Sequence, residues 1–229
     1  MKRFYKTVAI QRVGASHGIA LDGRPVKTPE REVLAMHALP LAEAIAAEWA
    51  RQGEDLGDMP LTRLANTAID RVAKDRSAAL AQLAHFLGHD LVCYRSAAPA
   101  ELAAREAAAW DPPLIWVRSR YGLDLHTTTA ALSIHQPGYD AAGFTQSLSQ
   151  ADPFVLTGLA AAAALLKSSV LALALCDLRI DAVQAHAAAH VDEFFQAEKW
   201  GWDAEAQKRL AGLLAELEVT NTFLQLAKS

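Results

Sequence analysis

The stretch VLAMHALPLAEAIAAEWARQG, residues 33–53, contains the change of pattern that decides the fold. Before it, over residues 4–35, apolar residues alternate with more polar ones, which is the period of a half-buried strand. After Pro40 the apolar residues recur every four positions, as on one face of a helix: Leu41, Ile45 and Trp49. Proline suits the first turn of a helix. The sequence therefore predicts a small antiparallel sheet followed by a helix.

Toward the N-terminus, the pair Asp22-Gly23 separates two short apolar runs. Asp-Gly favours a type I′ hairpin turn, because both central positions need a positive φ. The segment from Gly14 to Gly18 supplies an earlier turn, and Val33-Leu34 is a candidate last strand. Residues 14–18 also match the GxSxG pattern of hydrolases, which needs a helix after the serine. Since strands are expected on both sides, we interpret this segment as a turn.

Beyond Met59 the chain is predicted to be almost wholly helical. The Asp-Pro pairs at 111–112 and 152–153 each predict the start of a helix. Asp181 is expected to cap a long helix that runs to about Lys199, and Gly201 to end it. Asp203 is expected to cap a last helix, and residues 123–137 give no clear prediction.

Residues 154–176 are apolar enough to raise the question of a transmembrane helix. Lys167 lies near the middle of this stretch, where a charge costs about 2.5–3.5 kcal/mol in a bilayer. We therefore expect a buried pair of helices and no membrane insertion.

The fold class is accordingly α+β. The Gly- and Asp-containing link at 53–58 separates a small β-rich domain with one helix, residues 1–57, from a larger all-α domain, residues 58–229. The 229 residues are 52% hydrophobic and 21% charged, a composition that excludes intrinsic disorder as the default.

The net charge of −4 argues against a nucleic-acid-binding protein, which normally shows a basic excess. The charge is uneven: residues 1–31 hold seven Lys/Arg against two Asp/Glu, and residues 191–206 hold five Asp/Glu against one Lys. Cys93 and Cys176 lie in apolar surroundings and are expected to be buried free thiols in a reducing compartment. The basic N-terminus has no apolar stretch after it, so no secretory signal is expected.

No Walker loop or dinucleotide motif occurs, and no catalytic or cofactor-binding residues are predicted. The best metal candidate is His186 with His190 and Glu193, spaced along one predicted helix. The pattern lacks the glutamate of the HExxH motif, so a metal-dependent hydrolase is kept only as the alternative. Trp200 and Trp202 flank Gly201 at a helix end, where rigid aromatics can serve a partner. An interaction protein is favoured over an enzyme.

Several blocks together resemble one family. They are LDGRPVKTP at 21–29, MPLTRLANTAIDRV at 59–72, DLVCYR at 90–95, WDPPLIW at 110–116 and VDEFFQAEKWGWDAEA at 191–206. They are similar to the ATP-twelve family of assembly chaperones for the catalytic head of F-type ATP synthase. The segment between Pro29 and Pro40 departs from the family in lacking a Gly-containing turn.

This resemblance implies that the chain binds the free alpha subunit of the ATP synthase head and prevents its aggregation until the beta subunits take it up. It implies neither catalysis nor a cofactor, and the family fold joins a small β-containing domain to a larger helical one. We expect a monomer without nucleic-acid or membrane partners. An Ala-rich chain without an Arg- and Ser-rich transit peptide is expected in a bacterial cytoplasm, whereas eukaryotic relatives occupy the mitochondrial matrix.

The partner-binding residues are predicted in the last block: Asp192, Glu193, Trp200 and Trp202. The resemblance marks a glutamate of this Asp-Glu pair as functionally sensitive. Glu193 neighbours Ala189 on the predicted helix, so it can also be half-buried in an internal ion pair. The sequence leaves open whether Glu193 contacts the client, and it gives no stoichiometry or release trigger.

Overall fold

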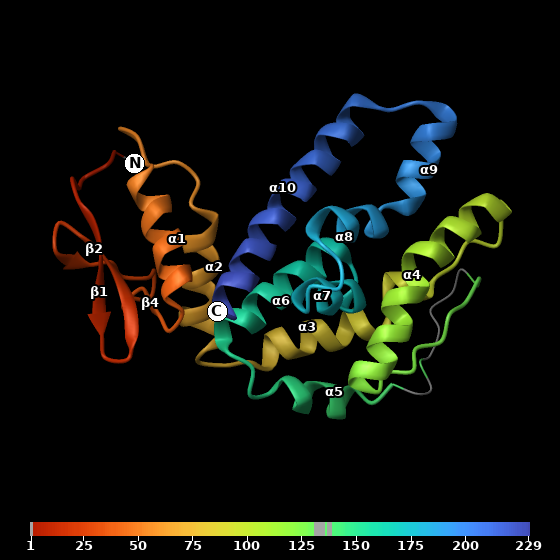
Figure 1. Ribbon diagram of the computed structural model, residues 1–229, viewed down its shortest axis with the longest axis horizontal. Coiled ribbons are helices and arrows are strands. Elements are labelled where there is room, and N and C mark those ends of the chain that lie inside the picture. The colour runs from red at the N-terminus through yellow and green to blue at the C-terminus, as the bar shows by residue number, and fades with distance from the viewer. Residues whose placement is uncertain (1, 131–135, 137–138) are drawn as a thin grey trace. The chain divides into compact units, whose positions relative to one another are not determined.

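The computed structural model describes residues 2–130, 136 and 139–229. Within them, a small antiparallel sheet of four strands lies near the N-terminus and ten α-helices follow it (Figure 1). The α+β class predicted from the change of pattern at Pro40 is confirmed. No helix of these described ranges is both long and apolar enough to cross a membrane. Part of the stretch 123–137, for which no element was predicted, lies outside the described residues.

Strand β2, Ser16–Leu21, is the centre of the sheet. It pairs over its whole length with β1, Val8–Val13, and also pairs with two short strands, β3, Arg24–Pro25, and β4, Ala35–Met36. In β2 the residues from Gly18 to Leu21 are buried, whereas the residues of β1 are half-buried or exposed.

The predicted hairpin between β2 and β3 is present. Asp22 and Gly23 adopt φ values of 48° and 78°, the positive values that a type I′ turn requires. The last strand, however, begins two residues later than the candidate Val33-Leu34. Val33 forms an isolated antiparallel bridge with Lys27 instead.

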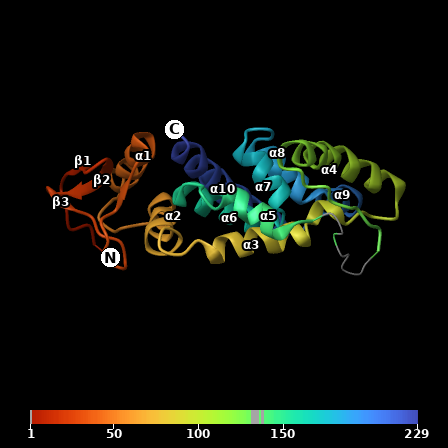
Figure 2. The same ribbon diagram turned by 90° about the horizontal axis from the view of Figure 1, so that it is seen from below.

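Helix α1, Leu39–Ala50, packs against β1 and β2 (Figures 1 and 2). The three apolar residues that predicted it, Leu41, Ile45 and Trp49, are all buried. The Tyr5 hydroxyl donates to the Trp49 carbonyl at 2.7 Å and fastens the N-terminal segment to the end of the helix. Arg51 is the C-cap of the helix, and its N–H donates to the Ala47 carbonyl at 3.1 Å.

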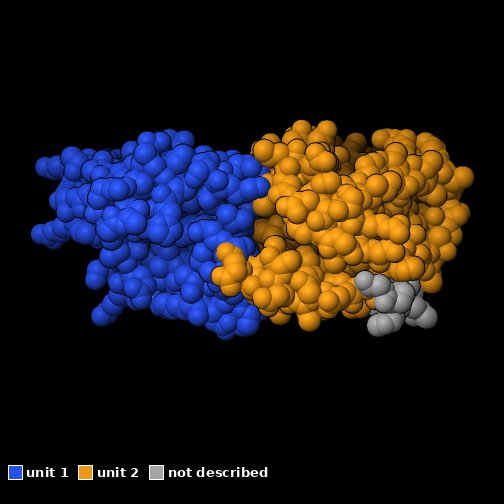
Figure 3. Space-filling view, turned by 60° about the horizontal axis from the view of Figure 1, so that its bottom comes forward, with its two compact units in different colours: residues 1–78, 151–158, 222–229 blue, residues 79–150, 159–221 orange. Residues whose placement is uncertain are grey.

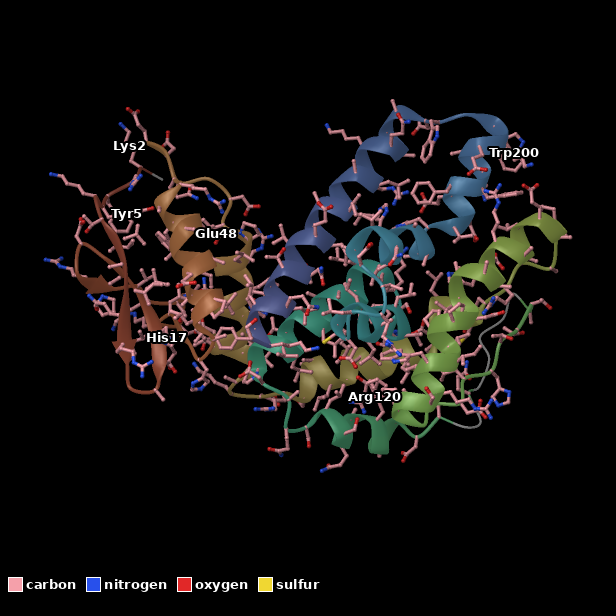
Figure 4. The ribbon with its side chains drawn as sticks, in the orientation of Figure 1. Lys2, Tyr5, His17, Glu48, Arg120 and Trp200 are labelled. Atoms are coloured by element: carbon pink, nitrogen blue, oxygen red, sulfur yellow. The ribbon has the colours of Figure 1, made fainter. Side chains whose placement is uncertain are left out.

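Helix α2, Pro60–Thr67, begins after Met59, whose side chain does not cap it. The cap comes from Glu48 on α1, labelled in Figure 4, which is only 5% exposed. Its Oε1 accepts from Leu61 N at 2.9 Å, and its Oε2 accepts from Thr62 N at 2.9 Å and Thr62 Oγ1 at 2.7 Å. A buried carboxylate therefore satisfies the first N–H groups of the helix and meets its positive end.

The helix continues past α2 as a π-helical segment, Ala68–Val72. Asp70 within it is buried and accepts from Thr28 Oγ1 at 2.5 Å and from Glu30 N at 3.1 Å. These bonds join the segment that follows β3 to the helix. Two sequence blocks that carried the family resemblance, 21–29 and 59–72, therefore contact each other.

The chain forms two compact units, coloured separately in Figure 3. Unit 1 contains Met1–Ala78, Ala151–Gly158 and Thr222–Ser229, and unit 2 contains Ala79–Gln150 and Leu159–Asn221. This division differs from the predicted domains 1–57 and 58–229. The hydrogen bonds of Glu48 and Thr28 give the physical reason, because they attach α2 to α1 and the π-helical segment to the chain that follows β3.

The end of the chain contributes to the core of unit 1. Phe223 and Leu224 are fully buried there, and the Phe223 ring lies 6.2 Å from that of Phe154, centroid to centroid. Gly158 leaves room for both of them, since a Cβ at this position would meet Leu224 Cγ at 2.7 Å and Phe223 Cδ1 at 3.2 Å. Residues far apart in the sequence thus share one core.

The remaining helices have the following bounds: α3, Ser77–Gly88; α4, Ala100–Tyr121; α5, Ala141–Leu148; α6, Pro153–Leu166; α7, Ser169–Cys176; α8, Ala182–Ala189; α9, Val191–Trp200; α10, Ala204–Ala227. The predicted buried helix pair at 154–176 is confirmed as α6 and α7, and every residue of α7 is buried. Lys167 lies at the exposed break between them with φ of 50°, and the Ser168 side chain caps α7.

Two predicted helix boundaries are wrong. Asp111-Pro112 does not start a helix but lies inside α4, whose buried face continues from Trp110 to Val117. Packing of that face offsets the backbone hydrogen bond that a proline removes. The long helix predicted from Asp181 to Lys199 is divided at His190, whose φ of −125° and ψ of 26° are not helical.

A buried carboxylate organises part of unit 2. Asp90 is fully buried and accepts from Val92 N at 3.3 Å and from Val170 N at 3.0 Å. Burial raises its pKa to about 7, although these hydrogen bonds oppose the shift. The predicted free thiols are present: Cys93 and Cys176 are both buried and unbridged, and burial raises the pKa of Cys93 to about 12.

Candidate partner-binding surface

The turn between α9 and α10 exposes two indole rings. Trp200, labelled in Figure 4, is the last residue of α9. It is 78% exposed, and Trp202 is 44% exposed. Gly201 between them has a φ of 92°, a value that residues other than glycine rarely adopt. Its N–H donates to the Ala197 carbonyl at 2.9 Å and ends the helix. Trp202 is partly fixed by an edge-to-face contact with Phe194, the ring centroids being 5.7 Å apart. The two rings are therefore presented by the sharp end of a helix.

A shallow pocket of about 240 Å³ lies at this turn, and we call its lining the α9–α10 surface. Its lining residues are Glu193, Gln196, Ala197, Trp200, Gly201, Trp202, Asp203, Ala206 and Leu210. Three of the four predicted partner-binding residues, Glu193, Trp200 and Trp202, are thus brought together. Asp192 does not line the pocket.

Glu193 forms an ion pair with Arg209 of α10. Both side chains keep much of their solvent access, 40% for Glu193 and 49% for Arg209. An ion pair this exposed contributes about 0–1 kcal/mol to stability. The carboxylate therefore has an internal partner, but it can exchange that partner for another cation at little cost.

Asp192 lies on a different side of α9, near Glu106 of α4. Glu106 is buried and accepts from Ser96 N at 2.7 Å and Ser96 Oγ at 2.5 Å. Partial burial, together with the hydrogen bond and the negative charge of Glu106, raises the pKa of Asp192 to about 6. Asp192 keeps an exposed position beside this buried carboxyl group of unit 2.

The negative charge of this region is offset more than the sequence indicated. Lys199 is the only basic residue within 191–206, and it binds Glu101 at 2.8 Å. Arg105 of α4 reaches Glu198 at 2.7 Å, and Arg209 reaches Glu193. Among the acidic side chains of this stretch, Asp203 caps α10 by accepting from Ala206 N at 2.8 Å. The surface around the indoles is consequently mixed in charge, with its carboxylates already oriented.

The three residues of the hydrolase alternative do not form a metal site. The rings of His186 and His190 lie 4.5 Å apart, centroid to centroid, with their planes tilted by 40°, and His190 Nδ1 lies 2.9 Å from the His186 carbonyl oxygen. Burial, followed by the charge of His190, lowers the pKa of His186. Because the helix breaks at His190, Glu193 belongs to the next helix and binds Arg209. The described part of the chain contains no group of three or more His, Cys, Asp or Glu side chains placed to hold a metal ion.

Sequence reasoning missed the residues that act from a distance. Arg105 and Arg209, which neutralise two of the acidic residues, come from α4 and α10 and have no signature near residues 191–206. The pairing of Glu106 with Asp192 is likewise long-range. Trp200 and Trp202, in contrast, were predicted from the sequence, because a glycine between two tryptophans marks a helix end at which large rings are exposed.

Comparison with known proteins gives consistent results over nearly the whole chain. A family model described as ATP12 chaperone protein matches residues 2–118. The crystal structure of Atp12 from Paracoccus denitrificans is 36% identical with a TM-score of 0.92, over 99% of this chain and 98% of that one. An engineered variant of the same Paracoccus protein matches equally, with 97% of that chain covered. A protein from Agrobacterium tumefaciens, classed provisionally as a chaperone, is 35% identical with a TM-score of 0.90, over 98% of this chain and 85% of its own.

Proposed function

Since the chain belongs to the ATP12 chaperone family, we propose that it is an ATP synthase assembly chaperone that binds the free alpha subunit of the catalytic head. The proposal follows the resemblance of the sequence blocks at 21–29, 59–72 and 191–206. It assigns no catalytic activity and no cofactor to the chain, and it expects a monomer. The Paracoccus and Agrobacterium relatives are bacterial proteins, which supports a bacterial source, and the proposal places the chain in the cytoplasm.

The observation that carries the proposal is the exposure of Trp200 and Trp202 on the α9–α10 surface. Tryptophan is the residue type most enriched in the energetic centres of protein interfaces. An indole that is 78% exposed leaves much apolar area in water, and this area is available to a partner. Glu193 adds a carboxylate at the edge of the same pocket.

The chemistry of the client fits such a surface. Subunits that alternate in a ring bury obligate interfaces of about 2,000–5,000 Å², which are unusually apolar and prone to aggregation when exposed. A protein that covers part of this area stabilises the free subunit by mass action. The beta subunit must later displace the chaperone, so a shallow surface with weak exposed ion pairs is suitable for hand-over.

The test is suppression of light scattering by alpha subunit diluted from denaturant, with Trp200→Ala/Trp202→Ala as the loss variant. Both side chains are exposed, so the fold should be kept. Loss of two interface tryptophans should weaken protection by about thirtyfold or more in the concentration required. Ile115→Ala, at a 69% exposed site on α4, is the matched control and should protect normally. Unchanged protection by the double variant, or equal protection of beta subunit and unrelated proteins, would contradict the proposal.

Glu193 needs a separate test, because its pair with Arg209 allows a structural role. Glu193→Gln and Glu193→Lys should both melt near the native temperature, and Lys should lose alpha binding far more than Gln. The exchange Glu193→Lys/Arg209→Glu restores an internal ion pair with its charges reversed. If alpha binding stays lost in the exchange variant, Glu193 contacts the client. If binding returns, the residue acts only through the fold.

A further inference from the structure

A second concave surface lies in unit 1, away from every residue of the α9–α10 surface in the sequence. It is a groove of about 740 Å³, a size typical of ligand-binding sites, and we call it the N-terminal groove. Its apolar lining comes from the N-terminal segment, the end of β2 and the residues after it, the end of α1 and the link before α2. The lining residues are Phe4, Tyr5, Leu21, Pro25, Val26, Trp49, Leu56 and Met59. Phe4 is 62% exposed at its margin, so the groove is open to solvent on that side.

The rim of the groove carries positive charge that the described residues do not neutralise. Arg24 and Lys27 line it, both are exposed, and neither has an ion-pair or side-chain hydrogen-bond partner among the described residues. Asp22 is the acidic lining residue, but its carboxylate is occupied: it accepts from Lys6 N at 3.1 Å and from Thr7 N at 2.8 Å. Two basic residues against one acidic residue leave the lining of the groove with a net positive charge. The rim therefore attracts an anion.

The floor of the groove is apolar. Trp49 lines it and is 92% buried. Its Nε1–H has no acceptor among the described residues, but this atom is itself shielded from solvent, so a molecule in the open groove does not reach it. The Tyr5 hydroxyl is also engaged, because it donates to the Trp49 carbonyl. The floor therefore offers apolar contact, and the rim supplies the charged groups.

We propose that the N-terminal groove binds a short segment of a partner polypeptide in which bulky apolar side chains are flanked by acidic residues. The apolar side chains fill the space between Phe4, Leu56 and Met59. The acidic flank pairs with Arg24 and Lys27. A polypeptide fits these features together because it combines bulky apolar side chains with carboxylates spaced along one chain.

The experiment uses the full-length protein and three fluorescein-labelled peptides with one Leu-Phe-Leu core, flanked by Glu, by Gln or by Lys. Fluorescence anisotropy at low salt should show the Glu-flanked peptide binding about tenfold more tightly than the Lys-flanked one, with the Gln-flanked peptide between them. The difference should shrink as salt is added, because the rim charges are exposed.

Three variants locate the binding. Arg24→Glu/Lys27→Glu should weaken the Glu-flanked peptide about tenfold or more and improve the Lys-flanked one. Phe4→Ala should weaken all three peptides while the melting temperature is maintained, since Phe4 lines the groove and is 62% exposed. Arg31→Glu, an exposed cation of the same unit outside the groove, is the charge control and should change binding less than about twofold.

Four results would overturn the proposal. These are no peptide binding up to about 1 mM, equal affinity for acidic and basic flanks, affinities unaffected by Arg24→Glu/Lys27→Glu, and binding of anionic phosphatidylglycerol vesicles in place of peptides. The test contains no ATP synthase subunit and does not involve Trp200 or Trp202. Its failure would therefore leave the proposed chaperone function untouched, and the failure of that function would leave the groove untouched.

Discussion

Replacement of Glu48 should reveal that α2 is capped from another helix. Glu48→Ala leaves two backbone N–H groups, of Leu61 and Thr62, and the Thr62 hydroxyl without their acceptor. An unsatisfied buried group costs about 1–3 kcal/mol, and a negative charge lost at a partly buried helix start costs up to about 2 kcal/mol. Allowing for water that enters the vacated space, we expect a loss of about 4–6 kcal/mol in unfolding free energy. That is a large fraction of the total for a domain.

Glu48→Gln separates charge from hydrogen bonding. The amide oxygen can still accept, but the amide nitrogen now faces a backbone donor and the charge is absent. We expect a loss of about 2–3 kcal/mol, intermediate between the wild-type protein and the alanine variant. Glu43→Ala is the matched control, because Glu43 is an exposed glutamate of the same helix, and it should change stability by less than about 0.5 kcal/mol.

The assays are urea unfolding followed by circular dichroism, and amide hydrogen exchange of the native protein. Exchange should accelerate first at residues 60–67 in Glu48→Ala, since the first turn of α2 loses its acceptors. A loss below about 1 kcal/mol in Glu48→Ala would refute the capping argument, and so would faster exchange spread evenly over the chain.

Three further predictions concern single residues. In denaturant titrations, Asp90→Ala should destabilise unit 2 by several kcal/mol, and Asp90→Asn by less. Because the pKa of Asp90 is raised to about 7 in the native state, its contribution to stability is present below about pH 4 and is lost as the pH rises through 7. Asp90→Asn should abolish this loss with pH. The pKa of Asp192 is raised to about 6 beside Glu106, so Asp192→Asn should gain in melting temperature over the wild type between pH 4.5 and 7.5. Gly158→Ala should cost about 1–3 kcal/mol, measured by thermal unfolding, because its Cβ would lie 2.7 Å from Leu224 Cγ in a closed core.

Local patterns predicted the elements that depend on local physics. The switch of period at Pro40 located the sheet and α1, Asp22-Gly23 located the hairpin, and Lys167 correctly argued for two buried helices in place of a membrane span. The candidate surface was predicted in part, because exposed tryptophans beside a glycine are visible in sequence, and the pocket joins them to Glu193. How that surface is used stays a prediction.

The remaining features depend on partners that are distant in the sequence. From local sequence, Pro112 predicts the start of a helix. It lies inside α4 because buried residues before and after it pack on the same face of the helix. Met59 and Pro60 start a helix without a side chain that could cap it locally. Such a start needs an acceptor from another part of the chain, and Glu48 provides it. Arg209 and Glu193 show the same limit, since sixteen residues and a turn separate the two members of the pair.

The contribution of residues 222–229 to unit 1 has a consequence for the order of events during synthesis. Phe223 and Leu224 pack against Phe154 and beside Gly158, which emerge from the ribosome much earlier. Contiguous N-terminal domains usually fold while the rest of the chain is still being made. Here unit 1 is completed only when the end of α10 is released, and until then the apolar residues at 151–158 lack these packing partners. A nascent chain of this protein therefore passes through a period in which it has the same exposure problem as the clients of a chaperone.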